Sequence, residues 1–449
     1  MPPRIIAVLS RLRQDLAACL GPEAIRAACR DRRHRWRDRA LGPVATVYLF
    51  LLQVLNGNTA CQHVVHFGRW TASASAYCRA RKRLPLAVLH RLLGAVADSV
   101  RGSTAEAARW LGHRVWVVDG SSFSMPDTPA LRAAFGQPAG QRPGCGFPVA
   151  KWTALFDVAT GMLLRSAAAP LRSGEMAAAA GLSDDLAPGG VVLGDRGFGS
   201  YAHVALLAAR ALHGVFRAHQ NRIVDFTPGR PEAGRGWPWA NPGRLPHSRW
   251  VLAHGPADQV VVWPKPEARP AWMSEADFAA LPAEVTVREL RYRVEVPGYR
   301  AGEVTLVTTL LEASAYPASA LADLYLRRWQ VEVNFRHLKI TMKMDVLRCK
   351  TVEGVLKELA MFALAYNLVR SVMAEAARQR GVEPERVGLA DAVRWLSGAE
   401  GGTDPGVLLV NPARPGRVEP RVVKRRPKQY LRMTKPRAEL RKELPSKYF

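Results

Sequence analysis

Four polar side chains recur at helical spacing in the stretch YLRRWQVEVNFRHLK. Steps of three, four and seven residues separate the members of this set, which are Tyr325, Arg328, Glu332 and Lys339. At about 100° of rotation per residue, all four fall within one helical stripe roughly 60° wide. The stripe places one carboxylate among two cations and a phenol, a combination suited to work on anionic groups.

Apolar residues flank this polar stripe on both sides of a helix expected to run from about residue 319 to residue 343. They are Leu324, Val331, Phe335 and Leu338 on one flank, and Leu326, Trp329, Val333 and Ile340 on the other. A helix with two apolar flanks is largely buried, so we expect the stripe to face a cleft. The same spacing is also compatible with a partly buried ion-pair ladder, in which Arg328 pairs with Glu332 at i, i+4.

The segment from residue 114 to residue 218 alternates short apolar runs with helical stretches. Predicted strands lie at 114–119, 151–158, 161–165, 190–193 and 214–218, and predicted helices lie near 174–186 and 201–212. Three strands followed by helix, strand, helix and strand indicate a mixed α/β sheet.

Two aspartates stand where apolar runs end and glycine-rich sequence begins. Asp119 precedes Gly-Ser-Ser, and Asp195 precedes Arg-Gly-Phe. Sheets of this class place ligands at the carboxyl ends of their strands, so we expect the two carboxylates to converge. Each aspartate, taken alone, is equally compatible with a residue that caps a turn. Asp127, in the loop sequence MPDTP, is a second choice for a supporting role.

Three carboxylates on separate elements of one α/β core can bind two divalent cations. Oxygen ligands suit Mg²⁺ or Mn²⁺, and two such ions clamp the attacking and leaving oxygens of an in-line phosphoryl displacement. Arg328 and Lys339 lie on either side of Glu332, where they would hold neighbouring phosphates, and the Tyr325 hydroxyl would hydrogen-bond another. The candidate metal ligands and catalytic residues are Asp119, Asp195 and Glu332.

Composition indicates a folded protein that binds nucleic acid. The 449 residues are 48% hydrophobic and carry a formal net charge of +26. Such an excess of basic residues favours nucleic acid as a partner, or less often an anionic membrane surface. The six cysteines form no CxxC pair or other zinc-site spacing, which is typical of reduced thiols in the cytoplasm. Because arginines interrupt the first residues, we expect no signal peptide, and the longest apolar run, 41–55, is shorter than a membrane span needs.

Basic segments lie near both ends of the chain. Residues 1 to about 105 are expected to be helical, with Thr71 or Ser73 as a helix cap. The cap precedes a basic cluster, which is Arg79, Arg81, Lys82 and Arg83. A short basic helix can enter a DNA groove, although the cluster also fits a solvated charged face. Residues 421–442 are rich in lysine and arginine and indicate an extended arm on the phosphate backbone.

A segment rich in proline, glycine and tryptophan interrupts the α/β alternation between residues 220 and 315. Strand-like runs at 249–252, 259–263, 285–296 and 304–311 indicate a mainly β insertion. An exposed tryptophan there would suit stacking on a base, while burial in the core of the β segment is the alternative for most of them. The tryptophans are Trp237, Trp239, Trp250, Trp263 and Trp272.

The pattern Y-x2-R-x3-E-x6-K resembles the YREK signature of DDE transposases of the insertion-sequence-4 type. That family also has an aspartate before a polar loop, similar to Asp119 with its Gly-Ser-Ser and the later MPDT. A second family aspartate ends a strand, similar to Asp195 before Arg-Gly-Phe. The order of the two aspartates, the β insertion and the glutamate-bearing helix matches as well, so the resemblance covers about residues 115–380.

The resemblance implies a ribonuclease H-like catalytic core in an α/β protein. The expected domains are a helical, DNA-binding region at 1–105, the core at 106–219 and 316–380, the insertion at 220–315, and a C-terminal region with the basic arm at 381–449. The metal ions would be two Mg²⁺ or Mn²⁺ ions on Asp119, Asp195 and Glu332. Tyr325, Arg328 and Lys339 would bind the DNA.

The implied activity is DNA transposition. The enzyme would cut at the terminal inverted repeats of an insertion sequence, and the freed 3′-OH would attack the opposite strand and later the target DNA. A homodimer holding two double-stranded DNA ends is expected, in the bacterial cytoplasm. Two alternatives share the same motifs: a metal-dependent nuclease or resolvase on this fold, and a domesticated, non-catalytic DNA-binding protein. Retention of all three acids and the whole stripe argues against the last.

Overall fold

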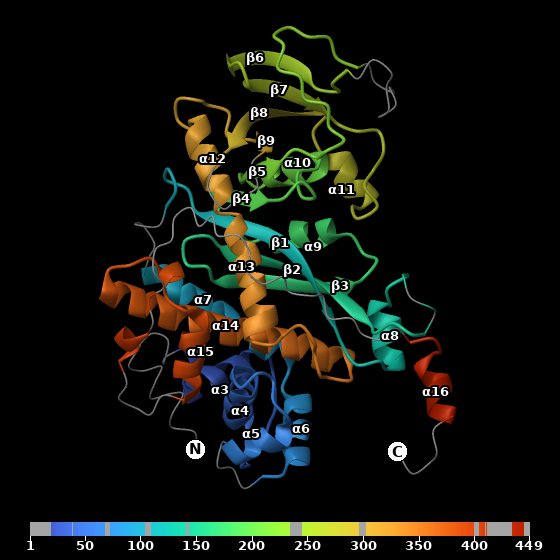
Figure 1. The fold of residues 1–449 in the computed structure, drawn as a ribbon, viewed down its shortest axis with the longest axis vertical. Helices are drawn as coiled ribbons and strands as arrows, with labels where there is room; N and C mark the ends of the chain where they lie inside the picture. The colour runs from blue at the N-terminus through green and yellow to red at the C-terminus, as the bar shows by residue number, and fades with distance from the viewer. Residues whose placement is uncertain are drawn as a thin grey trace, which may run out of the picture.

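The computed structural model describes residues 19–37, 39–67, 72–103, 109–140, 142, 144–233, 245–295, 302–398, 404–408, 410 and 433–443. A nine-stranded sheet runs through these residues (Figure 1). In chain order the strands are β1 (Val115–Ser124), β2 (Val149–Asp157), β3 (Leu163–Pro170), β4 (Val191–Gly194), β5 (His213–Arg217), β6 (Arg249–Gly255), β7 (Asp258–Pro264), β8 (Glu284–Val294) and β9 (Gly302–Thr308). In space they follow the order β3-β2-β1-β4-β5-β9-β8-β7-β6.

The first five strands form the half of the sheet that carries both candidate aspartates. β2 pairs antiparallel with β1 and β3, whereas β1, β4 and β5 run parallel. A short turn joins β2 to β3, which antiparallel pairing permits, while α10 (Tyr201–Ala209) forms the longer crossover that parallel β4 and β5 require. The predicted mixed α/β sheet is therefore confirmed.

β1 continues past Asp119, so the prediction that this aspartate ends its strand is wrong. Asp119 pairs with Ala154 of β2, and the residues that follow it stay in the same antiparallel ladder as far as Ser124. Pairing with β4 on the other side stops at Val117. Asp119 is therefore held by β2 in mid-strand and lies just beyond the end of the parallel pairing.

The segment predicted as a β insertion adds its strands to the edge of the same sheet. β9 pairs with β5, and β8, β7 and β6 continue the sheet as an antiparallel series. Trp263 of β7 is buried, its indole N–H donates to Glu289 Oε1 at 3.1 Å, and the Arg222 guanidinium lies 3.5 Å from its ring centroid. For Trp263 the core alternative is confirmed, because a ring covered in this way cannot stack on a base. Trp237 and Trp239 lie outside the described residues.

Helices pack on both faces of the sheet. Glu175 of α9 (Glu175–Leu182) lies against Gly120, where an added Cβ would be 2.7 Å from the glutamate carboxyl carbon. The preceding residue, Asp119, pairs with Arg328 at the start of α13 (Trp329–Arg336). Because adjacent side chains of a strand point to opposite faces, α9 and α13 cover opposite sides of the sheet. The structure also contains two short helices that the sequence pattern did not predict, which are α8 (Pro129–Phe135) and α11 (Glu275–Ala280).

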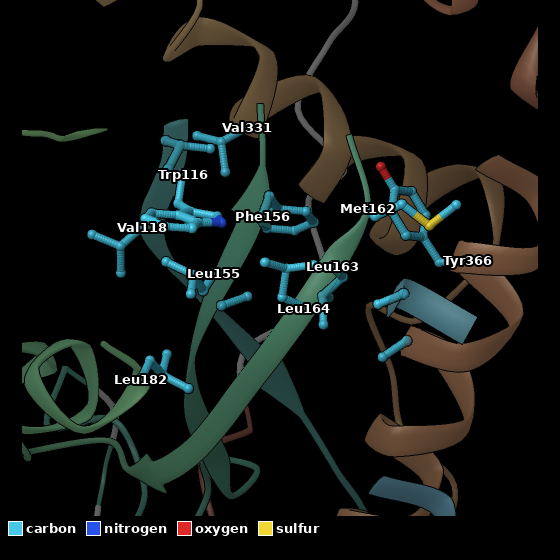
Figure 2. Close-up of a cluster of buried hydrophobic side chains, with 14 of the residues drawn as sticks. Trp116, Val118, Leu155, Phe156, Met162, Leu163, Leu164, Leu182, Val331 and Tyr366 are labelled. Carbon is cyan, nitrogen blue, oxygen red and sulfur yellow. The ribbon is translucent and has the colours of Figure 1, made fainter. Parts of the chain in front are cut away.

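The core beneath α13 is built around Phe156 of β2. Its ring meets Phe335 of α13 edge to face at 5.5 Å and Tyr366 of α14 (Val352–Arg380) at 6.2 Å. Figure 2 shows Phe156 in this cluster with Trp116 of β1 and Val331 of α13. Truncation of such a ring typically costs roughly 3–5 kcal/mol. The cluster therefore fixes α13, and with it Glu332, against the strands.

The predicted helical N-terminal region packs against α14 (Figure 1). Its described helices are α3 (Pro22–Asp31), α4 (Pro43–Leu55), α5 (Cys61–Phe67), α6 (Ala74–Arg83) and α7 (Leu86–Ser103). Ser73 is the cap of α6, because its Oγ accepts the Ala76 N–H at 3.2 Å. Lys357 of α14 donates to the Lys82 carbonyl oxygen at 2.8 Å, which ties the end of α6 to the core.

One member of the basic cluster on α6 turns inward. Arg81 donates to Gln53 Oε1 at 2.8 Å and lies 3.8 Å from the Phe50 ring centroid. Arg79, Lys82 and Arg83 are exposed. The surface charge of α6 therefore comes from three residues, and Arg81 is a structural side chain that packs α6 onto α4.

The C-terminal region contains α15 (Leu389–Gly398), α16 (Arg437–Glu443) and single 3₁₀ turns at Pro384–Arg386 and Pro405–Val407. Most of the predicted basic arm lies outside the described residues. At its described end, Arg437 donates to the Cys145 carbonyl oxygen at 2.7 Å and pairs with Asp127 at 3.3 Å. Asp127 thus anchors α16, and its supporting role stays a prediction. Among the described helices, none is long and apolar enough to cross a membrane.

Candidate active site

Asp119 and Asp195 lie at the same level of neighbouring parallel strands. β1 and β4 pair Val115 with Val191 and Val117 with Leu193, a constant offset of 76 positions, and the two aspartates differ by the same 76. Neighbouring strands are about 4.8 Å apart. The register therefore places the two aspartates side by side where the parallel pairing ends.

In each aspartate, one carboxylate oxygen accepts a hydrogen bond from a backbone N–H that follows closely in the chain. The Gly120 N–H donates to Asp119 Oδ1 at 2.8 Å, and the Gly197 N–H donates to Asp195 Oδ1 at 2.8 Å. A Cβ at Gly197 would lie 3.1 Å from that Asp195 oxygen, so glycine permits the close approach. The turn-capping alternative is thus correct as a local description. It leaves the second oxygen of each carboxylate for another partner.

The polar stripe does not lie on one continuous helix, so the predicted single helix over 319–343 is wrong. α12 (Ala318–Leu326) ends in a tight turn in which the Arg328 N–H donates to the Tyr325 carbonyl oxygen at 3.0 Å. α13 follows and passes into a π-helical turn at His337–Thr341, where the Met342 N–H donates back to His337 at 2.9 Å. Arg328 therefore stands at the start of α13, and Lys339 lies on the wider π-helical turn.

Arg328 joins two of the three acids. Its guanidinium lies 3.6 Å from Asp119 Oδ2 and 3.1 Å from Glu332 Oε1. The predicted i, i+4 pair with Glu332 is confirmed, and the pair with Asp119 adds a contact across to the sheet. The side chains of Arg328 and Asp119 are 14% and 19% exposed, against 44% for Glu332. The cluster is therefore partly buried, and Glu332 is its most exposed member.

The pKa of the Asp119 carboxyl depends on its burial and on the charged groups around it. Burial raises the pKa of this carboxyl to about 6, against the opposing effects of the Gly120 N–H and Arg328. Asp195 and Glu332 raise the pKa further, because each places negative charge nearby. The structure thus brings all three sequence-predicted acids into one electrostatic cluster, and the Arg328 guanidinium pairs with two of them.

Tyr325 lies beside Arg328. Its ring centroid is 5.7 Å from the Arg328 guanidinium carbon. Burial raises the pKa of the phenol to about 12, with Arg328 opposing and Asp195 reinforcing the shift. The hydroxyl therefore keeps its proton at neutral pH and is available as a hydrogen-bond donor.

Lys339 reaches β1 two positions beyond Asp119. Its Nζ donates to Ser121 Oγ at 3.2 Å and to the Ser122 carbonyl oxygen at 3.0 Å. Burial lowers the pKa of the ammonium, and Asp345 opposes that effect. Ser121 and Ser122 were not among the predicted site residues. Their position directly after Asp119-Gly120 was the available signal.

The donor set fits a divalent cation by its chemistry. Three carboxylates supply the hard oxygen ligands that Mg²⁺ and Mn²⁺ prefer, and their mutual repulsion at Asp119 is the charge that such an ion would relieve. In the part of the chain that the structure describes, no three acidic, histidine or cysteine side chains surround one point at ligand distance. Arg328 stands between Asp119 and Glu332 in this conformation.

Comparison with known proteins agrees with this geometry. The family model described as Transposase DDE domain matches residues 110–368, which contain all three acids and the whole stripe. The chain is 28% identical over 377 residues to transposase InsG of insertion sequence element IS4 from Escherichia coli, covering 79% of this chain and 77% of InsG. It is 45% identical over 53 residues to the transposase of insertion sequence element IS421 from Escherichia coli, covering 12% of this chain and 14% of that relative.

A solved structure of the piggyBac transposase synaptic complex with hairpin DNA is also similar, with a TM-score of 0.42, 11% identity and coverage of 85% of this chain and 78% of that one. The family model spans more than half of the chain, and it coincides with the sheet and helices that hold the acids. The chain therefore belongs to the DDE transposases, as its resemblance to the insertion-sequence-4 type implied.

Proposed function

We propose that the protein binds the terminal inverted repeats of an insertion sequence, cleaves DNA there by two-metal-ion phosphoryl transfer, and joins the 3′-OH ends to target DNA. One observation carries the proposal within the family: the β1–β4 register sets Asp195 beside Asp119, and Arg328 pairs with both Asp119 and Glu332, so three like charges lie close together. Repulsion of this kind is costly unless the acids serve a ligand or a reaction.

Asp119, Asp195 and Glu332 would hold two Mg²⁺ or Mn²⁺ ions through their free carboxylate oxygens. Bound ions would supply activation of the attacking water and polarisation of the scissile phosphate. The hydrogen bonds from the Gly120 and Gly197 N–H groups hold both aspartate carboxylates in a fixed orientation. Arg328 pairs with Asp119 and Glu332 in the free protein and would shift to a DNA phosphate when these acids take up cations.

Lys339 and Tyr325 would complete the grip on the DNA end. The Lys339 ammonium is fixed on β1 by Ser121 and Ser122, so its charge is pre-positioned beside the acids. The Tyr325 hydroxyl, protonated at neutral pH, would donate to a phosphate oxygen without adding charge. Together with Arg328 these groups flank the acids on the face covered by α13.

The wider architecture supports the same proposal. The order β3-β2-β1-β4-β5, with β1, β4 and β5 parallel, supports a ribonuclease H-like core at 106–219 and 316–380. We assign the exposed basic residues of α6 and the arm at 421–442 to DNA backbone contacts. A homodimer would bring two DNA ends together in the bacterial cytoplasm.

The test is metal-dependent cleavage and joining of terminal-repeat DNA. Wild type should nick and join ends with Mg²⁺ or Mn²⁺, while Glu332→Gln should bind the same DNA and do neither. Glu275→Gln, an exposed glutamate on α11, is the matched control and should behave as wild type. Equal cleavage by Glu332→Gln would show that the acid assignment is wrong. Cleavage without joining by wild type would identify a nuclease, and binding without either would identify a non-catalytic protein.

A further inference from the structure

A basic residue continues the line of the two aspartates on the next strand. β4 and β5 pair in parallel from Val191 with His213 to Gly194 with Phe216, a constant offset of 22 positions. Asp195 and Arg217 differ by the same 22. Asp119 of β1, Asp195 directly after β4 and Arg217 of β5 therefore stand at one level across three adjacent parallel strands.

Arg217 faces the side of the sheet that α12 covers. It pairs with Leu306 of β9, which pairs with Leu290 of β8, so these three side chains share one face. Asp119, at the same level, points to Arg328 between α12 and α13, so this is the face on which α12, which carries Tyr325, packs against β5 (Figure 1). Tyr292 follows Leu290 by two positions and therefore points to the same face as Arg217.

Both side chains lack the partners that a structural role would provide. Arg217 is exposed and makes no ion pair or side-chain hydrogen bond with any residue that the structure describes. The Tyr292 hydroxyl is buried and has no hydrogen-bond partner within the described residues. A buried hydroxyl left unpaired costs about 1–3 kcal/mol, which a bound acceptor would relieve.

The two groups lie in the same electrostatic cluster as the site. Burial raises the pKa of Tyr292 to about 12; Tyr325 and Asp323 reinforce this shift, and Arg217 and Arg328 oppose it. Arg217 acts on the Tyr325 phenol in the same way. These influences agree with the strand register, which puts Arg217 and Tyr292 on one face of the sheet, and with the packing of α12, which carries Tyr325, against β5.

We propose that Arg217 and the Tyr292 hydroxyl bind a phosphate of the DNA end on the β5 side of the acids, opposite the phosphate held by Lys339. The backbone of the bound strand then crosses the sheet from β1 to β5, over Asp119 and Asp195. Two contacts come from elements outside the YREK pattern, one of them from the insertion. This inference rests on the proposed function, since it assigns the ligand of the same site.

The experiment measures binding of terminal-repeat DNA in Ca²⁺ as a function of salt, and cleavage in Mg²⁺ at subsaturating DNA. Arg217→Gln should weaken binding about tenfold and reduce the slope of log K against log salt by about one, as expected for loss of one phosphate contact. Tyr292→Phe should weaken cleavage several-fold with the slope unchanged, because it removes a neutral donor. Arg165→Gln, on β3 and paired with Asp185, is the matched control and should leave the slope as in wild type.

A single methylphosphonate, which removes one phosphate charge, then locates the contact. One position on the strand should impair wild type but have no added effect on Arg217→Gln, and it should lie on the other side of the scissile phosphate from the position sensitive to Lys339→Met. If Arg217→Gln keeps the wild-type slope while wild type cleaves, this inference is wrong and the proposed function stands. If Arg217→Gln reduces the slope of log K against log salt by about one while wild type does not cleave, the phosphate contact stands and the catalytic proposal fails.

Discussion

The Arg328 guanidinium lies 3.6 Å from the Asp119 carboxylate, which links the start of α13 to the middle of β1. The same guanidinium pairs with Glu332, so one arginine compensates two acids that would otherwise repel each other. In the free protein, the positive charge of Arg328 therefore lies between two of the acids that we propose as metal ligands.

Removal of that arginine should make the protein depend more strongly on divalent metal for stability. Arg328→Gln leaves Asp119, Asp195 and Glu332 without their compensating charge, so its melting temperature in EDTA should fall below that of wild type. Millimolar Mg²⁺ should then raise the melting temperature of the variant by more than it raises that of wild type. Arg327→Gln, its exposed neighbour, should show neither effect. An equal response to Mg²⁺ in both proteins would rule out the compensating role.

The Asp119 carboxyl should impose a pH dependence on the metal-free protein. Its pKa is raised to about 6 by burial and by the neighbouring acids, so it contributes stability that is fully present below about pH 4 and is lost as pH rises through 6. Asp119→Asn should therefore be more stable than wild type at pH 8 in EDTA, by about 2–3 kcal/mol. The difference should vanish near pH 4. Urea unfolding at each pH measures it, with exposed Asp185→Asn as control.

His203 should set an opposite dependence on the acid side. The ring is fully buried, with its Nδ1 2.8 Å from the Phe198 carbonyl oxygen, and burial lowers its pKa to about 4. Its contribution to stability is present above pH 6.5 and is lost as pH falls toward 4, about 3 kcal/mol in all. His203→Leu should lack this loss, so its unfolding free energy should fall less between pH 7 and pH 4. Exposed His66→Gln should retain the wild-type slope.

Lys339 should act on DNA without contributing much to folding. Lys339→Met keeps the stem of the side chain but removes the charge held against Ser121 and Ser122. Cleavage of terminal-repeat DNA should drop by roughly ten- to a hundredfold, while the melting temperature stays within a few degrees of wild type. Ser121→Ala should give a smaller loss and no further loss in the Lys339→Met background. Exposed Lys350→Met is the control, and a comparable loss there would refute a specific contact.

The amino-acid sequence determined the local elements and the chemistry they carry. Apolar periodicity predicted the strands of the core and of the insertion, and Ser73 was a readable cap because its hydroxyl acts within one turn. The i, i+4 spacing predicted the Arg328–Glu332 pair for the same reason. The family resemblance rested on motifs of this local kind, and the match over residues 110–368 agrees with it.

Contacts between distant segments decided the rest, because no local pattern encodes a partner far along the chain. Asp119 sits in mid-strand because β2 supplies a backbone ladder beyond it, and Arg81 turns inward because Gln53 and Phe50 receive it. Packing of α12 on β5 and of α13 on the Phe156 cluster accompanies the break between these helices. Only the register of β1, β4 and β5 aligned Asp119, Asp195 and Arg217, since strand pairing is set by the whole sheet.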